Sequence, residues 1–375
     1  MRTTPLLPCL SLLSLALLPI GCTAPSTAPY SDPGASSGQA PVMLVLDGGV
    51  DVEPKGDLFN DARPRAAANA LLASLDDAQR QKISFALDSQ TRTDWHYIPR
   101  NRVGLPMGEM TDAQKRRLHD LLQTALSSAG YLKACDILWL ETLLAELENN
   151  PRGRDVGKYV VQLFGDPADA DAAWGWRLEG HHLSLNLLYA DGQVRVTPMF
   201  FGTNPAVVPT GPLAGKRVLS EEHTLALELV ETMTDEQRDK MMLEGKPRDI
   251  ITGPGREGLK GDFAGIHIED LTEPQTRQLL SVVGCFASNV NFDIAMHRAK
   301  QYAAANRMDQ WYEIHFAWAG PTDGSGPFYY RIHTPLYVIE YSCQNANHVH
   351  AVFHDLTDPL GKDLLREHFE RHEHD

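Results

Sequence analysis

Four copies of one helix-start pattern place the strongest constraint on how this chain folds. Each copy has an apolar residue, then Asp or Thr, then Gln three positions later, and the copies begin at Leu75, Met110, Met233 and Leu271. The Asp or Thr oxygen accepts a hydrogen bond from a free amide of the first turn, and the Gln side chain accepts one from the amide of the capping residue. Each copy opens a run with helical periodicity, so the pattern predicts four helices.

The four copies form two pairs that share one plan. The first pair is 35 positions apart (75 to 110) and the second is 38 positions apart (233 to 271). Each pair is followed by another helical stretch and then by strand-like sequence. An aromatic residue followed by Arg recurs later, with Arg177 matching Arg331 at an offset of 154. We therefore predict a tandem duplication, with halves at about 62–217 and 218–375, and two unrelated α+β subdomains remain the alternative.

The order of the expected elements predicts the α+β class. Helices are bunched before strands instead of alternating with them, which favours antiparallel strand pairing over βαβ units. The strands of the two halves would meet around a pseudo-twofold axis, as one continuous sheet or as a facing pair. A core shared between the halves would make residues 62–375 a single globular domain.

Residues 1–22 have the layout of a secretory signal peptide. One Arg precedes an apolar run that is short for a membrane span. The run ends in a small residue and Cys22, as in a bacterial lipobox, although Pro19 stands where such motifs usually carry Leu. We expect Cys22 to be lipidated, and a soluble secreted protein is the alternative. Residues 23–61, which begin with a stretch rich in Ser, Pro, Ala and Gly, predict a flexible tether.

These features predict an exported protein of the cell envelope. We expect an outer-membrane or cell-surface lipoprotein, with a secreted or periplasmic protein as the alternative. The formal net charge of −15 disfavours nucleic acid and anionic lipid as partners, so membrane contact is expected only through the lipid anchor. The globular part has only Cys135, Cys285 and Cys343, an odd and widely spaced set that indicates neither a disulfide framework nor a Cys-rich zinc site.

The segment GHHLSLN places polar residues inside an otherwise apolar strand. Alternation along a strand puts His182, Ser184 and Asn186 on one face and the leucines on the other, which we expect to be the core. A polar row in such a strand is costly unless its members are hydrogen-bonded or bind a ligand. In the predicted duplication Asn186 corresponds to Glu340, a strand carboxylate with apolar neighbours that needs a partner.

The segment NANHVHAVFHD supplies a candidate pair of metal ligands. His348 and His350 are two positions apart, so both project from one face of a strand. A hairpin would bring Glu340 next to them, and His182 could complete the set from the other half. Histidines with one carboxylate and an open position for water are typical of catalytic zinc, iron or copper centres. A metal-free polar pocket and purely structural histidines are the two alternatives.

Arg177 and Arg331 are the matched arginines of the two halves. Because both lie in strands flanked by aromatic residues, they could bind a substrate carboxylate or phosphate in a bidentate manner. The alternative is a buried arginine that pairs with an acidic residue such as Glu179 or Asp355. We predict that one of the two arginines orients the substrate.

Several of these segments, in the same order, resemble the bacterial family called "domain of unknown function 3500". The resemblance covers roughly residues 62 to 375 and rests on RTDWHYIPRNRVGLPMGEMT, WGWRLEGHHLSLN, TPMFFGTNPA, YYRIHTPLYVIEY and NANHVHAVFHD. It implies no activity, because the family name carries none. The sequence departs from the family pattern at 341–343, where an acidic Asp-Asn pair is usual, and at 353–354, where Trp-Arg is usual. The second departure makes His354 a poor candidate for an essential role.

The residues favour a metal-dependent hydrolase, with a metal-bound water as the nucleophile and a small molecule or peptide as the substrate. The sequence identifies neither the substrate nor the metal. A non-catalytic lipoprotein that binds a small ligand or a partner in the same concave site is the alternative.

Overall fold

The computed structural model describes residues 58–257, 263–304, 313–345 and 347–372. The predicted signal peptide, Cys22 and most of the predicted tether lie outside these residues. The helices are α2 (Ala62–Ala73), α3 (Asp77–Ile83), α4 (Asp112–Ala125), α5 (Ser128–Leu147), α6 (Ser220–Glu231), α7 (Asp235–Met241), α8 (Glu273–Ala287), α9 (Phe292–Ala304) and α10 (Lys362–His372). The strands are β1 (Ser84–Phe85), β2 (Leu105–Pro106), β3 (Val160–Gly165), β4 (Trp174–Gly180), β5 (Leu183–Ala190), β6 (Gln193–Thr203), β7 (Ile266–His267), β8 (His315–Ala319), β9 (Phe328–His333), β10 (Tyr337–Cys343) and β11 (Val349–Asp355).

The four predicted helix starts are confirmed at α3, α4, α7 and α8. Each of these helices begins after an Asp or Thr that forms a reciprocal capping box with the Gln three positions later. The capping glutamines of each pair also hydrogen-bond to each other at donor–acceptor distances of 2.7–3.1 Å, Gln79 with Gln114 and Gln237 with Gln275. The Gln of the pattern therefore both caps its own helix and ties it to the other helix of the pair.

One mixed sheet of eleven strands forms the centre of the molecule, so the α+β class is confirmed. The strand order is β1-β3-β4-β5-β6-β11-β10-β9-β8-β7, and β2 pairs with β3 off this path. All neighbours are antiparallel except β1 and β3, which are parallel. The predicted antiparallel pairing is thus right for every pair but one. The middle of the sheet is the pair β6 and β11, in which Gly202 lies opposite His350.

The same succession of elements occurs twice along the chain. Two helices, a short strand, a 3₁₀ turn, two helices and four strands run from α2 to β6 and again from α6 to β11. The first run additionally contains β1 and two short 3₁₀ turns, η1 (Gln90–Arg92) and η3 (Val156–Lys158). Because β6 and β11 are neighbours, the strands of the first run fill one side of the sheet and those of the second run fill the other.

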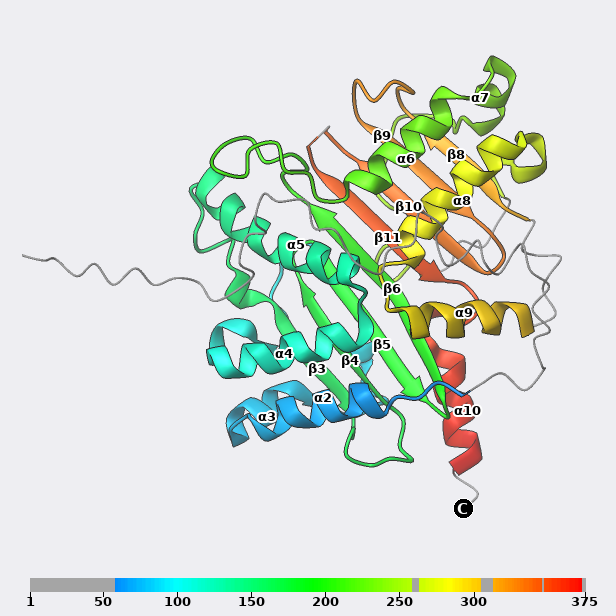
Figure 1. Ribbon diagram of the computed structural model, residues 1–375. Helices are drawn as coiled ribbons and strands as arrows, with labels where there is room; N and C mark the ends of the chain where they lie inside the picture. The colour runs from blue at the N-terminus through cyan, green and yellow to red at the C-terminus, as the bar shows by residue number, and fades with distance from the viewer. Residues whose placement is uncertain (1–57, 258–262, 305–312, 346, 373–375) are drawn as a thin grey trace, which may run out of the picture.

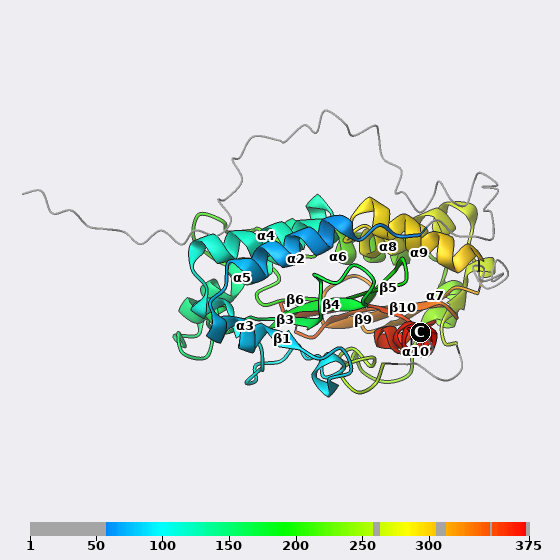
Figure 2. The same cartoon turned by 90° about the horizontal axis from the view of Figure 1, so that it is seen from below.

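The helices and loops cover opposite faces of the sheet. Six helices, α2, α4, α5, α6, α8 and α9, lie in one layer over a single face (Figure 1). Seen along the sheet, this layer lies on one side, and irregular chain segments together with α10 lie on the other (Figure 2). Leucines of β5 such as Leu183 and Leu185 belong to the large core cluster that includes the helix side chains, as the alternation of GHHLSLN predicts. A smaller cluster on the loop side contains Trp95, Phe200 and Val352.

The residues just before α2 are packed against the sheet. The Phe59 amide donates a hydrogen bond to the Gly192 carbonyl at 2.6 Å, and Trp174 Nε1 donates one to the Asp61 carboxylate at 2.9 Å, so the globular domain begins before α2. Cys135, Cys285 and Cys343 are all buried. Among the helices of the described residues, none has both the length and the apolar character needed to cross a bilayer.

Candidate metal centre

Three histidines come together at one end of the sheet, where β5, β6 and β11 meet. His182 lies in the turn between β4 and β5, His348 immediately precedes β11, and His350 is the second residue of β11. One ring nitrogen from each histidine lies within 4.8 Å of the others. The Nε2 atoms of His182 and His348 are 2.8 Å apart. The predicted convergence of His182 with the pair from the second half is therefore present in the structure.

The backbone at the turn aims His182 at this point. Its φ of 64° is left-handed, its amide donates to the Tyr97 carbonyl at 3.0 Å, and its carbonyl accepts from Gly202 at 2.7 Å. The imidazole lies over Gly202: a Cβ at position 202 would lie 2.9 Å from His182 Cδ2 and 3.0 Å from the Val349 carbonyl oxygen. The prediction that His182 belongs to the strand is wrong, since β5 begins at Leu183, but the turn directs it to the same face.

A carboxylate orients His350 from behind. Asp249 Oδ1 lies 2.7 Å from His350 Nδ1, and Gln344 Nε2 lies 3.1 Å from the same nitrogen. Burial alone would raise the pKa of Asp249, but the contacts with His350, the Ile250 amide and Gln344 together lower it. With Nδ1 occupied, Nε2 is the nitrogen of His350 that remains for a ligand. This carboxylate–histidine arrangement is the one that fixes ring orientation in metal sites.

Burial favours the neutral form of His182 and His348. Burial, and then the nearby His181, His350 and His348, lower the pKa of His182 well below its usual value. Burial and the neighbouring His350 lower the pKa of His348 to about 4. Metal ions bind the neutral form of the ring, so both side chains are ready to bind metal at neutral pH without losing a proton.

His181 connects the cluster to a surface cavity. Its ring stacks on His182 with centroids 3.7 Å apart, and its Nδ1 lies 2.6 Å from Glu141 Oε2. The cavity encloses about 720 Å³, counted with the solvent space at its mouth. Its lining combines basic, acidic and aromatic side chains, including Arg100, Lys158 and Tyr159. The three-histidine cluster thus lies one ring away from a space large enough for a small molecule.

The family model described as "Protein of unknown function (DUF3500)" matches residues 60–362. The chain belongs to this family. Comparisons with curated proteins and with solved structures gave no match. The predicted resemblance to the DUF3500 family is therefore confirmed over most of the globular part.

Glu340, the predicted carboxylate ligand, does not join the histidines. Its oxygens accept four hydrogen bonds, from the Ile251 amide, the Thr252 amide and hydroxyl, and the Tyr329 hydroxyl. Strand pairing explains the difference, because Ser342 lies opposite His350 while Glu340 lies opposite Val352. The carboxylate is on the expected face, but it is too far along the strand and it holds a loop instead.

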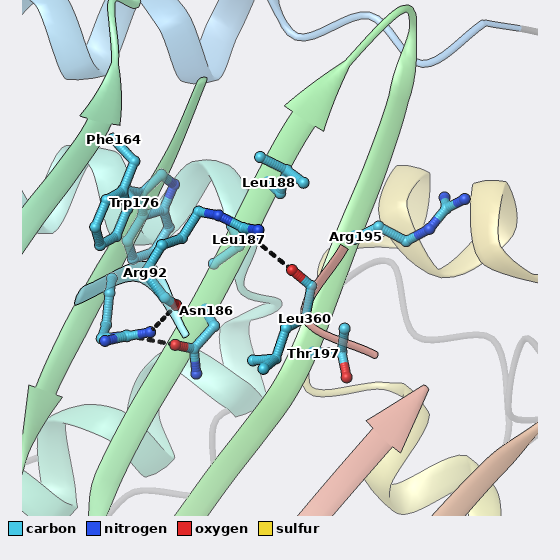
Figure 3. Close-up of a pocket in the computed structure, with 10 residues that line it drawn as sticks. Arg92, Phe164, Trp176, Asn186, Leu187, Leu188, Arg195, Thr197 and Leu360 are labelled. Carbon is cyan, nitrogen blue, oxygen red and sulfur yellow. Dashed lines mark hydrogen bonds between the residues drawn. The ribbon is translucent and has the colours of Figure 1, made fainter. Parts of the chain in front are cut away.

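Arg177 is committed to the protein interior of the DUF3500 domain. Its donors reach Asn186 Oδ1 at 2.5 Å, Gln162 Oε1 at 3.3 Å and three carbonyls of the 91–94 segment. Around it, Arg92, Trp176 and Asn186 line a small cavity of about 280 Å³ (Figure 3). Arg177 Nε also lies 3.8 Å from Glu179. These contacts match the structural alternative for Arg177, whose guanidinium is buried and orders the 91–94 loop.

Arg331 differs from its counterpart. It is buried, with 7 % of its surface exposed, and its Nε has no hydrogen-bond partner among the described residues. It lies on β9 opposite Glu340, two strands away from His350. The structure therefore does not place Arg331 at the three histidines, although it leaves the side chain available for a ligand.

The sequence did not point to Asp249, Gly202 or His181 as parts of this site. Asp249 directly follows Arg248 in a loop, and no local pattern in the sequence marks it as a partner of His350. Nothing local to Gly202 reveals that an imidazole lies on it.

His354 leads to a prediction on pH. It is fully buried, its Nε2 lies 2.7 Å from the Thr252 carbonyl, and burial lowers its pKa to about 4. The unfolded chain binds this proton near pH 6.5, so stability is complete above that pH and falls as the pH drops towards 4. His354 alone is expected to account for a loss of roughly 3 kcal/mol across this window. Urea unfolding of wild type and His354→Gln, measured at several pH values, should show a shallower pH dependence in the variant. Equal slopes would contradict the assignment.

Proposed function

We propose that His182, His348 and His350 bind one divalent transition metal, with zinc as the first candidate and iron or copper as alternatives. The observation that carries the proposal is the convergence of three ring nitrogens from two distant parts of the chain within 4.8 Å. The neutral state of His182 and His348 and the carboxylate behind His350 support it. Three protein ligands leave one position of a tetrahedral zinc for water, as in catalytic sites.

The spacing of the histidines suits a metal after a small adjustment. Two nitrogens bound to one tetrahedral zinc at 2.0–2.1 Å lie about 3.3 Å apart. The Nε2 atoms of His182 and His348 are at 2.8 Å, the distance of a hydrogen bond. Metal binding would therefore replace that hydrogen bond and separate the rings by about 0.5 Å.

A metal at this position would supply a Lewis acid and a water of lowered pKa, which favours hydrolysis as the reaction class. The cavity beside His181 is the space in which we place a small-molecule or peptide substrate. The direct His182–His348 contact also satisfies both rings without a metal. That contact is the observation in favour of the second candidate, a non-catalytic protein that binds a ligand in the same cavity.

The wider setting of the protein is part of the proposal. We propose export through the signal peptide at residues 1–22, anchoring through Cys22 in the cell envelope, and membrane contact through that anchor alone. The repeated succession of elements on the two sides of the β6–β11 pair supports an origin by tandem duplication. The net charge of −15 supports partners other than nucleic acid.

Gly202→Ala tests the site without removing a ligand. The added methyl group would contact His182 Cδ2 and the Val349 carbonyl, so His182 must move. Zinc affinity is expected to fall roughly tenfold or more, as for other residues that orient metal ligands. Turnover of ester, amide or phosphoester substrates by the zinc-loaded protein should fall with it and should be sensitive to chelator.

The matched control is Gly326→Ala, where the nearest atom to an added Cβ lies at an ordinary 3.5 Å. This variant should keep wild-type zinc affinity and turnover. Unchanged zinc affinity in Gly202→Ala would argue against the metal centre. Zinc binding without chelator-sensitive turnover of any of the three substrate classes would favour the non-catalytic function.

A further inference from the structure

A second polar cluster lies on the loop face of the sheet, at the opposite edge from β3. His267, His315 and His333 form a row across β7, β8 and β9, because His315 pairs with both of the others. Arg331 lies two positions before His333 on strand β9, so both side chains project from the same face of the sheet. Figure 1 shows β8 and β9 on the far side of the sheet from β3 and β4.

Polar atoms in this cluster are buried without partners. Arg331 Nε, His333 Nδ1 and His267 Nε2 make no hydrogen bond to any described residue. Arg331 also forms no ion pair within the described part of the chain, although only 7 % of its surface is exposed. A buried polar atom without a hydrogen-bond partner is costly, so the Nε of Arg331 and the two imidazole nitrogens point to a ligand that would satisfy them.

Arg177 and Arg331 differ in the residue that faces each of them on the neighbouring strand, and this explains why the Nε of Arg331 has no partner. Both arginines occupy corresponding positions, opposite Asn186 and Glu340 respectively. On its other side Arg177 faces Gln162, which accepts a hydrogen bond from it, whereas Arg331 faces Ala317. The methyl group of Ala317 neither fills the space nor accepts a hydrogen bond.

Charge in the cluster favours an anion. Glu340, the nearest carboxylate along the ladder, is already engaged in four hydrogen bonds to other groups. Burial, and then the nearby Arg331 and His315, lower the pKa of His333 to about 4. The Glu313 carboxylate lies 3.8 Å from His267 Nε2 and 4.0 Å from His315 Nε2, so it approaches the outer end of the row, and among the described residues no carboxylate forms an ion pair with Arg331. Phe263 packs on His315 and His333, with ring centroids 5.1 and 4.4 Å away, and forms an apolar wall.

A metal is the competing ligand, because His267, His315 and Glu313 also lie close together. His267 Nδ1 accepts a hydrogen bond from the Glu269 amide at 3.3 Å. Because Nδ1 accepts this bond, the ring proton lies on Nε2, which makes that nitrogen a donor and not a metal ligand. The charge of Arg331 further disfavours a cation at this edge.

We propose that Arg331 and His333, with His267 at the rim, bind a small oxyanion, a phosphate or carboxylate group. A guanidinium offers a planar pair of donors that matches both kinds of oxyanion. This site is separate from the three histidines, since the segment from Asp249 to Thr252 contacts His350 on β11 and Glu340 on β10 between them. It is therefore independent of the proposed metal centre.

Calorimetric titration of the full chain with inorganic phosphate and, separately, with succinate tests the site and distinguishes the two oxyanions. Saturable binding of at least one is expected, with affinity at least tenfold lower in Arg331→Gln. Arg366→Gln is the charge-matched control, because Arg366 is exposed on α10, and it should bind as wild type does. The His348→Ala/His350→Ala chain should also retain binding, which separates this site from the metal centre.

Three results would overturn the proposal. They are no heat from either anion with wild type, equal affinity in folded Arg331→Gln and wild type, or zinc binding in the His348→Ala/His350→Ala chain that His267→Ala abolishes. If Arg331→Gln does not fold, Arg331→Lys and His333→Gln carry the same comparison. Arg331→Lys keeps the charge but loses the planar fork, so a tenfold loss is still expected.

Discussion

Replacing His348 and His350 together by Ala is expected to abolish stoichiometric metal binding by this DUF3500 protein. The two residues supply two of the three ring nitrogens in the cluster, and His182 supplies the third. The single imidazole that remains in the variant does not hold zinc tightly. Protein purified without chelator should contain about one metal per chain, and the double variant almost none. At a zinc concentration about a thousand times Kd, the wild type should gain roughly 4 kcal/mol of stability that the variant lacks.

Elemental analysis and thermal unfolding with and without zinc measure both effects. A control pair is His119→Ala with His223→Ala, two half-buried histidines that each contact a tyrosine hydroxyl at 3.0 Å. That pair removes the same number of imidazoles and should leave metal content unchanged. Sub-stoichiometric metal in wild type, or the same metal content in the His348→Ala/His350→Ala chain, would contradict the metal centre and leave a metal-free pocket.

Local chemistry was readable from the sequence, and long-range geometry was readable only in part. The capping pattern acts within four residues, so the starts of α3, α4, α7 and α8 followed directly from it. Side-chain alternation gave the correct faces of β5 and β11. What alternation does not give is the register between strands, because a shift of two residues along a hairpin keeps every side chain on its face.

At single residues of the candidate site, too, the local sequence predicted side-chain chemistry better than three-dimensional surroundings. His182 reaches the cluster through a left-handed turn and not from a strand, so the prediction of its neighbours was right and that of its backbone was wrong. Arg177 and Arg331 have similar sequence surroundings, yet Gln162 and loop carbonyls satisfy one while Ala317 faces the other. Such differences depend on residues more than ten positions away, which a local pattern does not contain.

Glu340→Ala is expected to destabilise the fold severely while leaving metal binding intact. The carboxylate is fully buried and accepts four hydrogen bonds, two of them from backbone amides of the loop that also carries Asp249. Its removal leaves buried donors without partners at about 1–3 kcal/mol each, so a loss of at least about 3 kcal/mol in unfolding free energy is expected.

Urea unfolding and zinc stoichiometry of Glu340→Ala, measured under conditions in which the variant is folded, separate a structural role from a ligand role. Glu340→Gln keeps the shape and one acceptor oxygen, so its loss should be smaller, and Glu244→Ala, at an exposed position, should have little effect. A carboxylate that binds metal would give the opposite pattern, with metal lost and stability of the metal-free protein nearly unchanged. That pattern would restore Glu340 to the metal centre and would require the loop at Ile251 and Thr252 to release it when metal binds.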